Sequence, residues 1–208
     1  MKLDIISDPI CPWCYIGKTN LDAALLERPG HPFRVEWHPF QLNPTMPPEG
    51  MDRRAYLEGK FGGKDAALRA YAPVVEAAEK AGLTIAFDRI KRTPNTLDAH
   101  RLIHWAGIEG RQTAAVSRLF EAYFVEGLDI GDHGVLTKIA RAIEMDGDVV
   151  SKLLDSTADA QEIRDRDAHA RERGVQAVPM FIVGERHALP GAQPPELWRQ
   201  VLDEVSEP

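Results

Sequence analysis

Two cysteines three positions apart are the residues of this chain best suited to chemistry. Cys11-Pro12-Trp13-Cys14 follows a short apolar run at residues 3–6 and opens a stretch with helical spacing. Residues three apart on a first helical turn share a face, so the two sulfurs can form a disulfide. Pro12 suits the first helical position, where its missing N–H is not needed. The motif predicts thiol–disulfide exchange at a strand-to-helix junction.

The place of Cys11 at or just before the helix N-terminus has a chemical consequence. Unpaired backbone N–H groups and the helix dipole there favour a thiolate over a thiol. Such sites lower the pKa of a cysteine from ~8.5 to between ~3.5 and ~7.5, and the thiolate is the nucleophile. The position therefore favours a redox role for Cys11.

Two other interpretations of the cysteines stay open at this point. They could form half of a zinc site completed by His100 and His104, which are i, i+4 on an expected helix. The gap between Cys14 and His100 is far longer than the ~12–15 residues usual in such sites. Alternatively both thiols could be buried and inert, which the Pro-Trp pair at a helix start disfavours.

The composition excludes several classes of protein. The chain has 208 residues, of which 44 % are hydrophobic, enough for a substantial core. Its net charge of −7, with both signs interspersed, argues against nucleic acid or an anionic membrane surface as the main partner. No apolar run could span a bilayer, and the first residues do not resemble a signal peptide. We therefore expect a cytoplasmic protein, in which an isolated cysteine pair is catalytic more often than structural.

Strand and helix signals place the motif in a β-α-β unit. Residues 3–6 and 33–37 have strand patterns, and residues 15–28 between them have helical spacing. Near the C-terminus, residues 180–183 are expected to form a buried strand and residues 186–189 its partner. Pro194-Pro195 then opens a closing helix.

The middle of the chain, residues 51–173, is almost wholly helical in pattern. Apolar stripes at i, i+3, i+4, i+7 spacing are expected to face the core. They are Leu68, Tyr71, Ala72 and Val75; Ala99, Leu102, Ile103 and Ala106; Val116, Leu119, Phe120 and Tyr123; and Leu136, Ile139, Ala140 and Ile143. Pro73 predicts a kink or a new helix start, and Asp132 a helix N-cap. The charged run 161–173 is expected to be a solvated helix.

These elements predict an α/β protein with a discontinuous organisation. Residues 1–44 and 174–208 form two halves of one α/β unit, and residues 45–173 form a helical insert between them.

A proline stands immediately before the returning strand, in Val178-Pro179. X-Pro bonds are the one place where a cis peptide costs little, and the neighbouring backbone could then pair with a bound extended chain. Residues 11–18 and 174–179 give this chain its resemblance to the DsbA-like branch of the thioredoxin superfamily. It is most similar to the FrnE-type oxidoreductases, relatives of the 2-hydroxychromene-2-carboxylate isomerases and kappa-class glutathione transferases. Further matching stretches are residues 37–44, 91–96, 99–102, 122–127 and 191–194.

The resemblance implies a thioredoxin fold with a large inserted all-helical domain that covers the active site. It implies Cys11 as the exposed nucleophile and Cys14 as the resolving thiol. Pro179 would be a cis-proline that faces them, and Pro12, Trp13 and Val178 would lie beside bound substrate.

Asn95 and Thr96 fall in a loop that the family brings near the site. Contact with substrate and capping of the helix that starts at Leu97 are equally open for them. Met180 stands after Pro179, where relatives commonly carry threonine, so substrate choice could differ here.

The remaining candidates are polar residues that chemistry could use. His100 and His104 are expected to be structural or on the surface of the insert. Asp4 and Asp8 are the acids nearest the motif, and capping or solvated roles are favoured for them over a proton relay.

The sequence therefore predicts a dithiol–disulfide oxidoreductase, with reduction or isomerisation suited to the cytosol. Disulfide-containing proteins or small thiols would be its substrates, glutathione a candidate co-substrate, and nothing in the chain indicates an oligomeric state. No metal, flavin or nicotinamide motif is visible. Residues 60–64 also lack the pattern of a P-loop. One alternative is a glutathione-dependent isomerase or transferase, whose members typically carry serine at the first motif position. Another is a non-enzymatic holdase surface on the insert.

Overall fold

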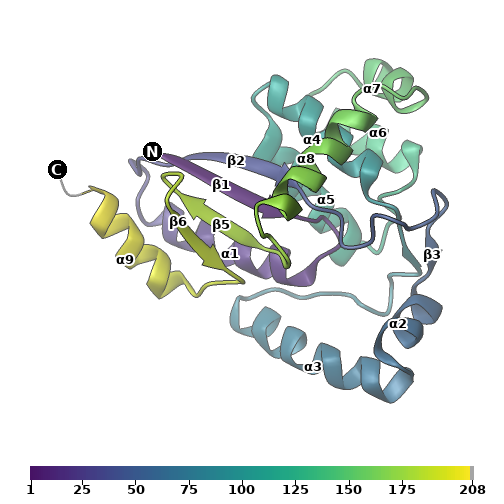
Figure 1. Cartoon of the computed structure of the whole chain (residues 1–208), viewed down its shortest axis with the longest axis horizontal. Coiled ribbons are helices and arrows are strands. Elements are labelled where there is room, and N and C mark those ends of the chain that lie inside the picture. Colours follow the sequence, from purple (N-terminus) through teal and green to yellow (C-terminus); the bar gives the residue numbers. More distant parts are fainter. Residues whose placement is uncertain (207–208) are drawn as a thin grey trace.

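A four-stranded mixed sheet lies at the centre of the protein in this computed structural model, which describes residues 1–206 (Figure 1). Across the sheet the strands are β2 (Arg34–Pro39), β1 (Lys2–Ser7), β5 (Met180–Val183) and β6 (His187–Pro190). β1 is parallel to β2 and antiparallel to β5, which is antiparallel to β6. The predicted strands are confirmed to within two residues at each end.

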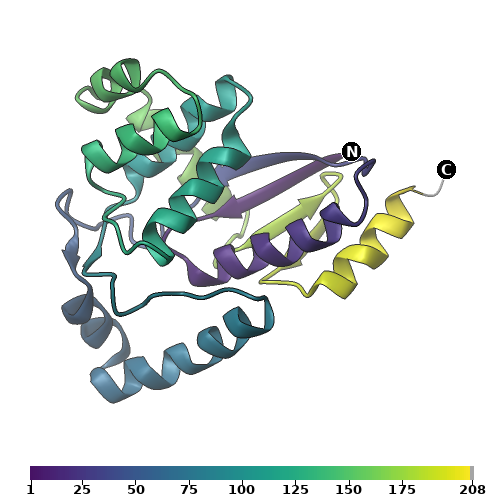
Figure 2. The ribbon, with the colours of Figure 1, turned by 180° about the vertical axis from the view of Figure 1, so that it is seen from behind.

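Two helices cover one face of this sheet, as Figure 2 shows. α1 (Pro12–Leu26) connects β1 to β2, because two parallel strands need a crossover of this kind. α9 (Pro195–Ser206) packs beside α1. Trp198 of α9 meets Phe181 of β5 edge to face, with ring centroids 4.9 Å apart. The β1–α1–β2 unit that the sequence predicts is confirmed.

The chain between β2 and β5 is mostly helical, as expected. Its helices are α2 (Arg53–Phe61), α3 (Lys64–Lys80), α4 (Leu97–Ile108), α5 (Gln112–Phe124), α6 (His133–Ala142), α7 (Gly147–Leu154) and α8 (Ala160–Glu172). Two short strands, β3 (Met51–Asp52) and β4 (Arg92–Thr93), pair antiparallel beside them. The Asp132 carboxylate accepts a hydrogen bond from the N–H of Val135 at 2.8 Å and so caps α6 as predicted. Within residues 1–206 no helix has both the length and the apolar character needed to cross a bilayer.

The sheet and the helices α4–α6 share one hydrophobic core. Leu3 and Phe181 of the sheet belong to the same buried cluster as Leu119 of α5 and Leu136 of α6. Three of the predicted apolar stripes, those of α4, α5 and α6, are buried in it. This shared packing fixes α4 beside the end of β1, where the cysteines lie. The division of the chain at residues 44 and 174 stays a prediction.

The expectation for the stripe on α3 is wrong. Leu68 is 62 % exposed and Val75 is also exposed, whereas Val74 and Ala78 are buried against Ile16 of α1. The helix turns a different face inward because its contact is with α1 rather than with the main core. α3 also continues through Pro73, so no new helix starts there.

The expectation of a solvated helix at residues 161–173 is wrong for one side of α8. Asp167 is buried, and its carboxylate accepts hydrogen bonds from the N–H of Gln41 at 2.7 Å and from Nε of Arg171 at 2.8 Å. Arg166 hydrogen-bonds the ring of His38 on β2 at 3.2 Å. α8 therefore lies on the opposite face of the sheet from α1 and adds charged contacts to the apolar one that Ala170 makes with the core (Figure 1).

Candidate active site

The Cys11–Cys14 segment forms the first turn of α1. Cys11 is the N-cap residue, with extended backbone at φ −86° and ψ 114°, and Pro12 occupies the first helical position as predicted. The N–H of Cys11 donates to the carbonyl of Asp8 at 2.9 Å, and the N–H of Cys14 donates to the carbonyl of Cys11 at 3.1 Å. These bonds fix the tight turn between β1 and α1. They place the first thiol at the positive end of the helix dipole.

Both cysteines are reduced in this structure and both are buried. The pKa of the Cys14 thiol lies well above its usual range, first because of burial and then because of its hydrogen bond to Cys11. Hydrogen bonds from the Ser7 side chain and the Asp8 backbone act in the opposite direction but are weaker. Cys14 therefore keeps its proton at neutral pH.

Cys11 faces the segment that precedes β5. Its Sγ lies 3.6 Å from the carbonyl oxygen of Val178, within reach of a weak S–H hydrogen bond. The Val178–Pro179 peptide bond is cis, and the carbonyl of Pro179 accepts a hydrogen bond from the N–H of Gly191 at 2.8 Å. The structure thus brings together residues separated by 167 positions, as the resemblance implied.

Gly17 permits this close approach of α1 to the proline. A Cβ placed on Gly17 would lie 3.2 Å from the ring of Pro179 and 3.2 Å from the ring of Phe181. It would also lie 3.3 Å from the backbone of Ala192, which cannot easily move. A side chain at position 17 would therefore push the cysteine helix away from the cis-proline segment.

Trp13 joins the motif to α3. It is half-buried and packs on the small cluster formed by Ile16, Val74 and Ala78. Pro12 beside it is half-buried as well. The expectation that Cys11 is exposed is wrong, because the residue is only 4 % exposed and its neighbours in the fold cover it.

Asn95 and Thr96 lie at the start of α4 and make different contacts. Asn95 Oδ1 accepts from the N–H of Leu97 at 2.9 Å, and its Nδ2 donates to the carbonyl of Met46 at 2.7 Å. The capping role is therefore confirmed for Asn95, whereas Thr96 makes no side-chain cap. The Thr96 side chain is buried and hydrogen-bonds the carboxylate of Asp8. A contact of either residue with substrate stays a prediction.

Asp8 and His100 form a buried polar pair beside the cysteine turn, which the sequence did not predict. Asp8 is fully buried, and burial raises the pKa of its carboxyl from 3.8 to about 7, although the backbone N–H groups of Leu42 and Ile10 hydrogen-bond it. Burial lowers the pKa of His100 to about 4. Nε2 of His100 lies 3.8 Å from Asp8 Oδ1 and has no hydrogen-bond partner among residues 1–206. The expected solvated role of Asp8 is therefore wrong.

The ligands that a zinc site would need are not brought together. Within the described part of the chain, two groups of side chains are close enough to hold a metal ion: Asp4, Glu36 and His38, and His104, Asp159 and Glu162. Neither group contains a cysteine. Lys2 pairs with both carboxylates of the first group, at 2.9 and 3.1 Å, so an ammonium ion already occupies the place of a cation there.

A pair of thiols at the start of the first helix, beside a cis-proline and a mixed sheet, is typical of thiol–disulfide exchange proteins of thioredoxin fold. Residues 2–203 match the family model of the DsbA-like thioredoxin domain. This chain therefore belongs to the DsbA-like thioredoxin family.

Three solved structures share its fold over nearly the whole chain. A probable DsbA oxidoreductase from Streptomyces coelicolor is 29 % identical with a TM-score of 0.86, covering 99 % of this chain and 89 % of that one. The cytosolic disulfide reductase DsbM from Pseudomonas aeruginosa, solved with glutathione, is 21 % identical with a TM-score of 0.70, covering 99 % and 98 %. A 2-hydroxychromene-2-carboxylate isomerase is 15 % identical with a TM-score of 0.73, covering 99 % and 96 %. The last two likenesses concern the fold alone.

Proposed function

We propose that this protein is a cytoplasmic thiol–disulfide oxidoreductase that uses Cys11 and Cys14 to reduce small disulfides. The observation that carries the proposal is the unequal pair of thiols at the N-terminus of α1. Cys11 has the helix dipole behind it, whereas the pKa of Cys14 is raised by burial and by Cys11. The two thiols are thus suited to successive steps of one reaction.

The first step is attack by the Cys11 thiolate on one sulfur of a substrate disulfide. The S–S bond of the substrate breaks, one half leaves as a thiolate, and Cys11 forms a mixed disulfide with the other half. Cys11 then no longer carries a charge, so one of the causes that raise the pKa of Cys14 is lost. Cys14 can now release its proton to water and attack Cys11. The second substrate thiolate leaves, and the Cys11–Cys14 disulfide remains.

Regeneration requires two reducing equivalents. Two molecules of glutathione would supply them, reducing the Cys11–Cys14 disulfide and leaving as glutathione disulfide. The presence of glutathione in the DsbM structure supports this choice of co-substrate. No metal or organic cofactor takes part in either half of the cycle.

The burial of Cys11 favours small substrates over folded proteins. A thiol that is 4 % exposed and lies beside the Val178 carbonyl, under a cover of neighbouring residues, is open to a narrow disulfide but not to one on a protein surface. A folded partner would first require local opening of this cover, at a cost in free energy. Small disulfides other than that of glutathione, such as cystamine, are therefore the proposed class.

The experiment that tests the function is a redox titration of the cysteine pair. The protein is equilibrated in graded glutathione buffers, and its free thiols are alkylated and counted by mass spectrometry, with Cys11→Ser and Cys14→Ser as controls. A reversible two-electron transition to an intramolecular disulfide is expected. Its midpoint potential determines whether the pair acts as a net reductant or a net oxidant in the cell. Failure to form that disulfide at any ratio, together with non-covalent glutathione binding, would favour the glutathione-dependent isomerase instead.

The preference for small substrates can be tested separately. Initial rates are measured with cystamine and with insulin, at equal disulfide concentration and with the same glutathione-coupled readout. We expect cystamine to react faster, because insulin must wait for the cover over Cys11 to open. Dithiothreitol-driven reduction of insulin without enzyme is the background. Equal rates on both substrates would contradict the preference and leave the exchange activity itself intact.

A further inference from the structure

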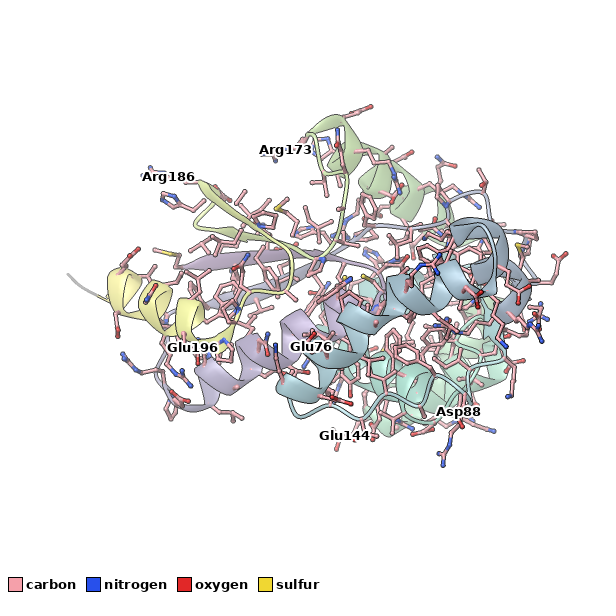
Figure 3. The ribbon with its side chains drawn as sticks, turned by 90° about the horizontal axis from the view of Figure 1, so that it is seen from below. Glu76, Asp88, Glu144, Arg173, Arg186 and Glu196 are labelled. Carbon is pink, nitrogen blue, oxygen red and sulfur yellow. The ribbon has the colours of Figure 1, made fainter. Side chains whose placement is uncertain are left out.

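A cavity lies away from the cysteines, between α2, α3 and the loop that follows α3. Its volume is about 530 Å³, and neither cysteine lines it. Leu57 of α2, Val75 of α3 and Phe87 of the loop form part of its apolar wall. Figure 3 labels Glu76 on α3 and Asp88 in the loop, and Asp88 lies at the polar edge of the cavity. The volume is in the range of pockets that hold small organic molecules.

The apolar stripe of α3 has no partner in this cavity. Leu68, Ala72 and Val75 recur at helical spacing and line the cavity, and all three are exposed. The neighbouring face of the helix, with Val74 and Ala78, is already buried against α1. Contiguous exposed apolar surface of this kind marks a binding site more often than an ordinary surface.

A buried cation stands in the wall of the same cavity. Arg53 is 7 % exposed, and its guanidinium donates to the hydroxyl oxygens of Tyr123 at 3.0 Å and Tyr71 at 3.1 Å. Those bonds use two of its five N–H donors. Its guanidinium carbon also lies over the rings of Tyr71, Phe87 and Tyr123, at 5.6, 5.8 and 5.9 Å from their centroids. These ring contacts stabilise the cation only in part, and within residues 1–206 no carboxylate forms an ion pair with it. A buried charge without a counter-charge is costly, so an anion that entered the cavity would be favoured.

The charges at the rim limit that anion to a single negative charge. Three acids, Asp52, Glu58 and Asp88, and three bases, Arg54, Lys64 and Lys91, also line the cavity. Glu58 is paired with Arg54 at 2.8 Å. The positive and negative charges at the rim are therefore equal in number, and only the positive charge of Arg53 has no negative charge to balance it. A phosphate dianion would bring one charge too many into a largely apolar space.

The geometry points to a binding site for a small amphipathic monocarboxylate, such as a medium-chain fatty acid. Its carboxylate binds the Arg53 guanidinium, and its apolar chain covers Leu68 and Val75. A charge-assisted pair of this kind is directional, because the planar guanidinium can bind both carboxylate oxygens at once. The cavity shares no residue with the cysteine turn.

The test is calorimetric titration of the purified protein with decanoate below its critical micelle concentration. Decanol and decyltrimethylammonium serve as the uncharged and cationic probes of equal chain length. Saturable binding of decanoate at one site is expected, with affinity roughly tenfold or more above that for either other probe, because a hydrogen-bonded charge pair is lost with them. Equal binding of all three probes, or none of decanoate, would overturn the proposal.

Two variants locate the site. Leu68→Glu places a carboxylate in the exposed stripe and is expected to abolish decanoate binding, whereas Leu26→Glu, at an 81 % exposed position on α1, is the matched control and should bind normally. Arg53→Met should also abolish binding, with circular dichroism to check that it folds. Undiminished binding by Leu68→Glu would place the ligand elsewhere. Sedimentation equilibrium could also show a dimer that dissociates in the Leu68→Glu variant. A second copy of the chain would then cover the stripe, which also overturns the proposal.

Discussion

Replacing Cys14 with serine is expected to stop the reaction at a mixed disulfide between Cys11 and substrate. Cys14 lies one helical turn from Cys11, and in the proposed cycle it attacks Cys11 as soon as the mixed disulfide forms. A serine hydroxyl cannot take that role, because it is a far weaker nucleophile than a thiolate. With glutathione disulfide as substrate, Cys14→Ser should accumulate protein that is heavier by one glutathione in intact-mass spectra.

The variant Cys11→Ser provides the matched comparison. It should show no adduct and no activity, since Cys14 is 1 % exposed and a substrate disulfide cannot reach it. The adduct of Cys14→Ser should disappear on treatment with dithiothreitol, which shows that it is a disulfide. Adduct formation on Cys14 in the Cys11→Ser variant would reverse the assigned roles. Full turnover by Cys14→Ser would instead indicate that glutathione, rather than Cys14, resolves the mixed disulfide.

The local parts of this site could be predicted because they depend on neighbours in the sequence. Pro12 at the first helical position and the strand–helix–strand order around the cysteines follow from short-range patterns. The contact of Cys11 with Val178 joins the two ends of the chain, and the residues alone could not fix it. The family resemblance supplied it, because the same pair of motifs recurs in proteins of this fold.

The charged helix α8 shows why other contacts could not be predicted. Its composition indicates a solvated surface, since charged residues are rarely buried unless they are paired. Its Asp167 is buried because the N–H of Gln41, 126 positions earlier, reaches its carboxylate together with Arg171. No pattern within the helix contains that partner. The burial of polar residues here is a property of the assembled fold.

The exposure of Leu68 on α3 could not be predicted, for the reverse reason. Periodic apolar residues indicate a buried face only if another element covers it. In α3 the covering element, α1, contacts the neighbouring face at Val74 and Ala78, so the regular stripe stays open. Periodicity therefore located the apolar surface correctly and could not show what lies opposite.

Asp8 should make the protein less stable as the pH rises from about 4 to about 7. Its carboxyl has a pKa near 3.8 in the unfolded chain and about 7 in the folded protein. Between these values the folded state binds more protons, so the free energy of unfolding falls with rising pH. At about 1.36 kcal/mol for each pKa unit, the full cost above pH 7 is on the order of 4 kcal/mol, and it vanishes below pH 3.8.

His100, which lies beside Asp8, has the opposite effect on how the stability of the wild type depends on pH. Burial lowers the pKa of His100 to about 4 from 6.5, so His100 costs stability as the pH falls through that range. A simple pH profile of the wild type would therefore mix the two effects. The contribution of Asp8 is found only as the difference between the wild type and a variant that keeps His100.

Asp8→Asn is that variant, because an amide of nearly the same shape cannot ionise. Urea unfolding at a series of pH values between 4 and 8 should show Asp8→Asn gaining on the wild type by up to about 4 kcal/mol as the pH rises. Asp65→Asn, at an exposed position in the first turn of α3, controls for the loss of a surface carboxylate. A difference between Asp8→Asn and the wild type that stays constant with pH would show that the Asp8 carboxyl titrates alike in the folded and unfolded chain. In that case a buried charge at Asp8 would have to be met by its backbone donors at Leu42 and Ile10.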